Sequence, residues 1–163
     1  MERAARPATV EDLKQLVEHL NRESVDYLLI GGYALMALGY QRGTTDIDLL
    51  LPRDPGTGER IKRALLYLPD QAARELKPEW FAEDEAIRVA DEIVIDLLFT
   101  ASGETYDSLL PHAVTVDLGG VTVRTLDIEG LLKTKQSARD KDKLDRLILE
   151  RALAELRAKQ IVP

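Results

Sequence analysis

Residues 44–52, TTDIDLLLP, have the apolar character of a buried β-strand, yet they carry two acids, Asp46 and Asp48. Side chains of a strand alternate between its two faces, so both carboxylates point to one face and Ile47 points to the other. Their α-carbons lie roughly 6.5–7 Å apart at the rise of a strand. Two carboxylates at that spacing can converge on one divalent cation, although many such pairs are only solvated strand ends.

A second predicted strand, residues 92–100, EIVIDLLFT, repeats the letters Ile-Asp-Leu-Leu around Asp96. A carboxylate buried in such a run without a partner costs several kcal/mol, so a compensating group is expected. A metal ion would serve, and so would an ion pair with Arg88 or Arg124. If the three acids cluster, their repulsion predicts that Asp96→Asn leaves the metal-free protein at least as stable.

Three carboxylates without nitrogen or sulfur ligands form the kind of site that Mg²⁺ prefers, with Mn²⁺ as the alternative ion. Such a site, if it keeps open coordination positions, suits phosphoryl chemistry, because the metal also binds the phosphates of the substrate. The sequence therefore predicts a metal site at Asp46, Asp48 and Asp96, provided that the two strands are neighbours.

The segment LLIGGYALMAL, residues 28–38, predicts a strand that ends in Gly31-Gly32 and passes directly into a helix. Glycine lets a ligand approach the backbone closely, and free N–H groups at a helix start bind phosphate oxygens. Turns of this kind often serve packing alone. The spacing of a Walker loop is absent, so the signal depends on the acid pair that follows it.

The composition is that of a globular protein: 163 residues, 45% hydrophobic and 31% charged, with a net charge of −7. The negative charge disfavours a broad nucleic-acid surface, so no DNA partner is expected. The absence of cysteine excludes thiolate metal sites, and two histidines make a multi-histidine zinc site improbable. We see no apolar leader and no membrane-spanning run, which predicts a cytoplasmic protein without membrane contact.

Strand and helix patterns alternate up to residue 126, and only helical patterns follow. We therefore expect an α/β fold with a mixed sheet in residues 1–126 and a helical segment, residues 127–163, packed on it. Thr9 and Asp12 have the spacing of a capping box at the start of the first helix. Residues 113–125 predict a hairpin, and residues 69–86 fit no pattern.

The helical segment contains KTKQSARDKDKLD, residues 133–145. Lys135, Arg139 and Asp142 are spaced i, i+4, i+7 and would line one face of a continuous helix. A solvated helix with internal ion pairs explains such a charge run equally well. The alternative is that Lys135 or Arg139 binds an anionic substrate and that Asp142 orients the cation.

Taken together, these motifs resemble the nucleotidyltransferase fold of the DNA polymerase β superfamily, and more narrowly the small bacterial AbiEii-type nucleotidyltransferase toxins. The resemblance covers about residues 25–100 and extends to the Lys-x-x-x-Arg-x-x-Asp segment. In this family a glycine pair precedes Arg-x-Thr-x-Asp-x-Asp and a third acid on a neighbouring strand. The matching positions here are Gly31, Gly32, Arg42, Thr44, Asp46, Asp48, Asp96, Lys135, Arg139 and Asp142.

The resemblance implies transfer of an NMP unit from an NTP such as ATP to a hydroxyl of RNA, tRNA, protein or a small molecule. Two Mg²⁺ ions are implied, with Asp48 and Asp96 on the catalytic ion, Asp46 bridging both, and Asp96 as general base. It also implies a toxin with an antitoxin partner. Tyr33, also assigned to the nucleotide site, replaces the usual serine, and the gap to Asp46 is long. Both departures favour the alternative of a non-catalytic nucleotide-binding or antitoxin-like module.

Overall fold

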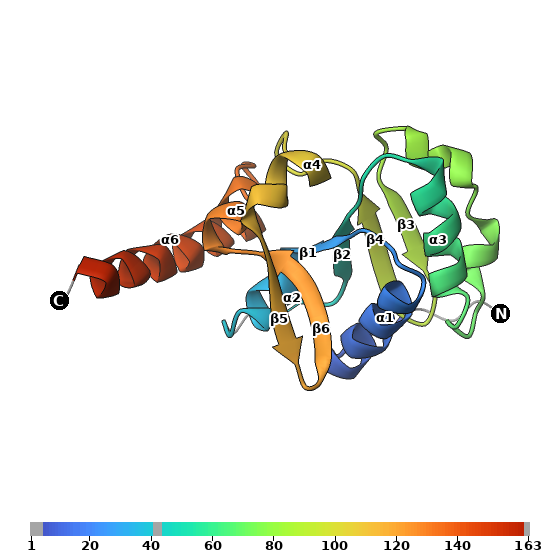
Figure 1. Cartoon of the computed structure of the whole chain (residues 1–163), viewed down its shortest axis with the longest axis horizontal. Coiled ribbons are helices and arrows are strands. Elements are labelled where there is room, and N and C mark those ends of the chain that lie inside the picture. The colour runs from blue at the N-terminus through green and yellow to red at the C-terminus, as the bar shows by residue number, and fades with distance from the viewer. Residues whose placement is uncertain (1–4, 41–43, 162–163) are drawn as a thin grey trace.

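The computed structural model describes residues 5–40 and 44–161. Figure 1 shows a sheet with helices beside it, a separate hairpin, and a long C-terminal helix that extends away from the sheet. The strands are β1 (Leu28–Ile30), β2 (Ile47–Leu50), β3 (Ile87–Ala90), β4 (Val94–Leu98), β5 (Ala113–Leu118) and β6 (Val121–Leu126). The α-helices are α1 (Val10–Arg22), α2 (Gly31–Ala37), α3 (Pro55–Leu65), α4 (Tyr106–Leu109), α5 (Ile128–Lys133) and α6 (Asp140–Ile161). The 3₁₀ helices are η1 (Ala72–Glu75), η2 (Pro78–Ala82) and η3 (Leu110–His112).

The main sheet is mixed and has the strand order β1-β2-β4-β3, which confirms the expected α/β class. Strands β2 and β4 run parallel, whereas β1 with β2 and β3 with β4 run antiparallel. The two Ile-Asp-Leu-Leu strands are therefore the central pair, and the register aligns their identical letters. Asp48 is the direct partner of Asp96.

The core lies on the sheet face opposite to these acids. Ile47, Leu49, Ile95 and Leu97 are fully buried, while the alternate positions that carry the acids are only partly buried. Helix α1 adds its buried apolar side to the same core, and its start has the expected capping box. There the Thr9 hydroxyl accepts a hydrogen bond from the Asp12 N–H, and the Asp12 carboxylate accepts one from the Thr9 N–H. The alternation of the strands thus buries their apolar residues and leaves the acids at a surface.

The helical segment from residue 127 onward consists of two helices, because the chain breaks between α5 and α6. Asp127 caps α5, as its position predicts, by accepting the Gly130 N–H. The helix ends at Thr134, whose hydroxyl donates to the Leu131 carbonyl at 2.6 Å. Residues 134–139 then form a connection before α6 starts at Asp140. The i, i+4, i+7 rule therefore does not apply to Lys135 and Arg139.

The predicted hairpin forms from β5 and β6 and is anchored beside β1. The Thr125 hydroxyl donates to the Leu29 carbonyl at 2.7 Å, and the Tyr27 hydroxyl accepts the Arg124 N–H at 3.1 Å. Residues 69–86, which fit no pattern, contain η1 and η2, and Phe81 of η2 is fully buried. Proline starts η2, and the buried Phe81 packs it against the core. Packing therefore determines the structure of this segment, which is why the sequence shows no periodic pattern there.

Helices α5 and α6 contribute Leu131, Leu149 and Ala152 to the same buried core as the sheet. A boundary at residue 126 stays a prediction. Within residues 5–40 and 44–161, no helix has the length and apolar character needed to cross a membrane.

Candidate functional site

The three predicted acids come together at one edge of the central strand pair. Asp48 and Asp96 are paired across β2 and β4, and Asp46 lies two residues before Asp48 on the same side of the chain. Burial, followed by the nearby charge of Asp96, raises the pKa of Asp48 to about 6. Lys135 and Lys141 act in the opposite direction. Asp48 therefore carries its negative charge at a cost that a bound cation would remove.

Arg88 of β3 forms an ion pair with Asp96, one of the two arginine pairs that the sequence left open. Its Nε donates to Asp96 Oδ1 at 2.9 Å and its Nη2 donates to Asp96 Oδ2 at 3.2 Å. The same Nη2 lies 3.5 Å from Asp46 Oδ2. The other candidate, Arg124, lies instead 3.8 Å from Asp26. The guanidinium of Arg88 thus bridges two of the three acids.

Gly31 is required at the start of α2 because of the position of Asp48. Its φ is +76°, a left-handed conformation that favours glycine. A Cβ at this position would overlap Asp48 Oδ2 and would lie 3.1 Å from Asp48 Cγ. The first glycine of the pair therefore makes room for an acid of the site itself. This role differs from the close approach to phosphate that the sequence suggests.

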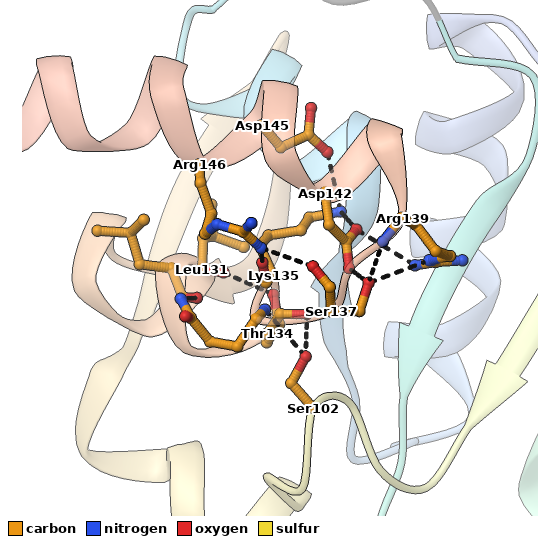
Figure 2. A network of polar contacts seen from close by, with 11 residues as sticks. Ser102, Leu131, Thr134, Lys135, Ser137, Arg139, Asp142, Asp145 and Arg146 are labelled. Atoms are coloured by element: carbon orange, nitrogen blue, oxygen red, sulfur yellow. Dashed lines mark hydrogen bonds and ion pairs between the residues drawn. The ribbon is translucent and has the colours of Figure 1, made fainter.

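A basic connection between α5 and α6, shown in Figure 2, carries Lys135 and Arg139, which line the same cavity as the three acids. The Lys135 side chain is only 9% exposed, and its Nζ lies 3.0 Å from Asp145 Oδ2 and 3.8 Å from Asp142 Oδ1. Arg139 Nη2 lies 3.2 Å from Asp142 Oδ1. Burial opposes ionisation of Asp142, but the hydrogen bond from Ser137 and the charges of both cations outweigh it and lower its pKa.

The connection is also held by Arg146 of α6 and by Ser102 in the loop after β4. Arg146 donates to the carbonyls of Lys135 and Ser137, the latter at 2.8 Å. The Ser102 hydroxyl donates to the Thr134 carbonyl at 3.1 Å and accepts the Gln136 N–H at 3.0 Å. Figure 2 shows these groups around the turn. The backbone that carries Lys135 is therefore fixed to both neighbouring elements.

Acids and cations line one small cavity of about 140 Å³. It is lined by Gly32, Thr44, Asp46, Asp48, Arg88, Asp96, Lys135, Arg139, Lys141 and Asp142. A larger cavity of about 540 Å³ shares six lining residues with it: Asp48, Arg88, Asp96, Lys135, Arg139 and Asp142. The larger cavity also reaches Ser102 and Thr134. Asp48 and Asp96 therefore line both spaces, whereas Asp46 lines only the smaller one.

The predicted metal site, Asp46, Asp48 and Asp96, holds a guanidinium beside two of its acids. Among the described residues, no group of three or more His, Cys, Asp or Glu side chains is placed to hold a metal ion. The position between Asp46 and Asp96 is taken by the guanidinium of Arg88. The donor chemistry nevertheless fits Mg²⁺, because oxygen ligands line a cavity and already hold a cation. The fit requires Arg88 to move away from them.

One described residue assigned to nucleotide binding, Tyr33, lines neither cavity. The ring of Tyr33 is buried in the core, and its hydroxyl donates to the Ala8 carbonyl. Tyr33 therefore does not line the cavity, which corrects its assignment to the nucleotide site. The apolar surroundings of the ring explain this placement. Arg42 lies outside the described residues. Thr44 does line the cavity, and its hydroxyl donates to the Asp46 carbonyl at 3.3 Å.

The sequence reasoning missed Asp145, counted Lys141 only as additional charge near the basic segment, and named Arg88 only as one of two alternative ion-pair partners of Asp96. Asp145 is fully buried and lies three residues after Asp142, so helical spacing alone would have placed it on the same face. Arg88 is the strand partner of Asp96, and only the register of β3 on β4 reveals this. Lys141 lies in the first turn of α6 and lines the cavity.

No protein-family model matches the sequence, and no curated protein matches it either. A solved structure does match: TM1012 of Thermotoga maritima, a protein that carries the name "putative nucleotidyltransferase". The two share 15% sequence identity and a TM-score of 0.55, over 92% of each chain. The chain therefore has a nucleotidyltransferase-like fold, and at this identity the match speaks for the fold alone.

Proposed function

We propose that this protein is a Mg²⁺-dependent nucleotidyltransferase that transfers an NMP unit from an NTP to an acceptor hydroxyl. The observation that carries the proposal is the pairing of Asp48 with Asp96 on parallel strands, beside Asp46, in a cavity whose opposite wall is basic. Neighbouring carboxylates repel one another and destabilise the folded protein unless a bound cation neutralises them.

In the proposed reaction the acceptor oxygen attacks the α-phosphorus of the NTP. A new phosphorus–oxygen bond forms, the bond to the β-phosphate bridging oxygen breaks, and pyrophosphate leaves. The acceptor proton passes to the carboxylate of Asp96, the general base of the scheme. Asp46, Asp48 and Asp96 would hold two divalent ions, which supply an activated acceptor oxygen and neutralise phosphate charge when bound.

The basic wall has the charge that a triphosphate needs. Four acids, Asp46, Asp48, Asp96 and Asp142, and four cations, Arg88, Lys135, Arg139 and Lys141, line the small cavity. The cavity is thus close to neutral, and two divalent ions would make it strongly positive. A nucleoside triphosphate, with about four negative charges, restores neutrality far better than a monophosphate does. Lys135 and Arg139 would then contact the leaving pyrophosphate and stabilise its developing charge.

The acceptor of the NMP unit would be one of three classes of molecule. An RNA or tRNA end, a protein side chain and a small molecule all present hydroxyls, and the protein would act on one of them in the cytoplasm. Its resemblance to AbiEii-type toxins supports the role of the toxin in a toxin–antitoxin pair, with an antitoxin as partner. ATP is the donor with which to begin.

The decisive experiment measures pyrophosphate release with Mg²⁺ and a labelled NTP, with RNA and protein fractions supplied as acceptors. Wild type should label one fraction, and Asp46→Asn/Asp48→Asn should lose activity by several orders of magnitude while keeping its fold. Asparagine preserves shape and removes the charge on which metal binding depends. A well-folded double variant that retains activity would exclude the mechanism.

A second candidate function is a non-catalytic nucleotide-binding or antitoxin-like module on the same scaffold. The Arg88 bridge favours it, because this guanidinium neutralises two of the acids without any metal. Tyr33 stands where the resembling family has a serine that contacts phosphate, but its hydroxyl donates to the Ala8 carbonyl and cannot replace that contact. Stabilisation of wild type by Mg²⁺–NTP in a thermal melt, with no transfer to any acceptor and all four NTPs, would favour this module.

A further inference from the structure

Arg88 lies on the edge strand of the main sheet, directly opposite Asp96 in the β3–β4 pairing. It donates to both carboxylate oxygens of Asp96, at 2.9 Å and 3.2 Å, and reaches Asp46 at 3.5 Å. Its side chain is 62% exposed. It therefore occupies the oxygens of two proposed metal ligands without being packed into the protein.

We propose that Arg88 is a displaceable internal cation that holds Asp46 and Asp96 in the metal-free protein and must leave before metal binds. This inference rests on the proposed function, because it takes these acids to be the metal ligands. The guanidinium and a divalent ion compete for the same oxygens, and the two positive charges repel each other at that distance. A compact divalent ion prevails because an exposed ion pair is worth only about 1 kcal/mol.

The structure also provides a place for the released guanidinium. Arg88 lines a neighbouring cavity of about 320 Å³ together with Trp80, Glu83 and Glu85. The two glutamates offer carboxylate partners, and the indole offers a face for a cation–π contact. Arg88 thus has two alternative sets of partners, one in the acid cavity and one beside Trp80. Rotation of its exposed side chain exchanges them without opening the core.

Two consequences follow for metal binding. Removal of the guanidinium abolishes the competition, so the metal affinity of the acids rises. It also leaves Asp46 and Asp96 without their bridging cation, so the metal-free protein loses stability. A residue that merely supported the fold would lower both quantities together. Opposite changes in metal affinity and metal-free stability are therefore the signature of Arg88 as a displaceable cation.

Trp80 is the single tryptophan of the chain and is 37% exposed, so its fluorescence reports on the second cavity. The experiment titrates Mg²⁺ into wild type, Arg88→Met and Arg88→Lys while calorimetry records binding and fluorescence records Trp80. Melts in EDTA give the stability of the metal-free proteins. Methionine keeps the length of the side chain without its charge, and lysine keeps the charge without the fork.

We expect Arg88→Met to bind Mg²⁺ about tenfold more tightly than wild type, which corresponds to ~1.4 kcal/mol. It should also melt at a lower temperature in EDTA and should lose the fluorescence change that accompanies binding in wild type. Arg88→Lys should fall between the two. If Arg88→Met folds poorly, the lysine variant carries the same test with a smaller shift.

The outcomes separate the two proposals. Equal or weaker Mg²⁺ affinity in the variants, with clear binding in wild type, overturns the role of Arg88 and leaves the metal site standing. Absence of Mg²⁺ binding in wild type and in both variants overturns the metal site of the proposed function itself. A fluorescence change that persists in Arg88→Met contradicts the movement of Arg88 toward Trp80.

Discussion

Asp48 and Asp96 are direct partners across the parallel strands β2 and β4, and both line the same cavity. Their surroundings nevertheless differ. Asp96 is neutralised by the fork of Arg88, whereas the partly buried Asp48 has its pKa raised to about 6 by burial and by the charge of Asp96. The strain of the acid cluster in metal-free protein is therefore concentrated at Asp48.

The first prediction is that Asp48→Asn stabilises the metal-free protein at pH 7.5. A pKa of about 6 means that Asp48 is ionised at this pH against burial and the charge of Asp96. Removing that charge should increase the free energy of unfolding by about 1–3 kcal/mol. Thermal melts in EDTA measure it, with Glu59→Gln on the exposed side of α3 as the control. A lower melting temperature for Asp48→Asn would show that the acid is not strained.

The sequence predicted that the acid cluster is strained, but it did not indicate that Asp48 is the acid whose pKa is raised. Alternation along residues 44–52 placed Asp46 and Asp48 on one face, and the repeated letters identified the second strand. The expectation that Asp96→Asn costs nothing in metal-free protein depended on Asp96 having no cation beside it. Arg88 provides one, because β3 returns antiparallel on β4 in a register that no local pattern specifies.

The basic part of the site was predicted for a geometric reason that the structure overturns. Lys135 and Arg139 do face the acids, but from a connection between helices and not from one helix face. Their convergence comes from tertiary contacts such as those of Ser102 and Arg146 with the turn. Helical spacing describes residues within one helix, so it could place Asp145 beside Asp142 but not Lys135 beside either.

The second prediction separates the two demands on Gly31. Gly31→Ala should be destabilising and should displace Asp48, because φ is +76° and the new Cβ overlaps that carboxylate. Gly39→Ala is the matched control: its φ is +98°, but among residues 5–40 and 44–161 no atom lies within 4 Å of the added Cβ. We expect a loss of about 1 kcal/mol for Gly39→Ala from backbone strain, and a clearly larger loss for Gly31→Ala. Urea unfolding measures both, and equal losses would exclude the close-packing role.

The third prediction concerns pH and lies outside the site. The Arg6 hydrogen bonds lower the pKa of Asp12 from 3.8 to about 2, and Asp12 also completes the capping box of α1. A lowered folded-state pKa stabilises the protein above pH 4, and this stabilisation is lost as the pH falls from about 4 to 2. Asp12→Asn should therefore lose about 1 kcal/mol at pH 7 and much less at pH 2. Melts across this range test it, and a pH-independent loss would contradict it.

The fourth prediction tests the proposed contact of Arg139 with the leaving pyrophosphate. The Arg139 side chain is 72% exposed, so Arg139→Ala should change stability by no more than about 0.5 kcal/mol. It should weaken the binding of an NTP more than the binding of the matching NMP, measured by calorimetry with Mg²⁺. Lys143→Ala is the control, because Lys143 is an exposed cation of α6 that does not line the cavity. Equal losses for both nucleotides would remove Arg139 from the triphosphate.

The last prediction addresses Lys135 and the acids that hold it. The Lys135 side chain is 9% exposed, and Asp145, whose side chain is fully buried, lies 3.0 Å from its Nζ. Removing one partner of a buried pair leaves an uncompensated charge, so Lys135→Met should cost about 3–5 kcal/mol. Lys133→Met, an exposed position two residues earlier, should cost almost nothing.

A double-mutant cycle with Asp145→Asn then tells whether the pair or the lysine alone is responsible. If the two charges are coupled, Lys135→Met/Asp145→Asn should be more stable than the sum of the single losses predicts. Urea unfolding of the four proteins gives the coupling free energy, which we expect to exceed about 1 kcal/mol because the pair is buried. Strictly additive losses would show that Asp145 does not hold Lys135. The double variant, if it folds, should then bind NTP more weakly than wild type, because the cavity has lost a cation on its phosphate-facing wall.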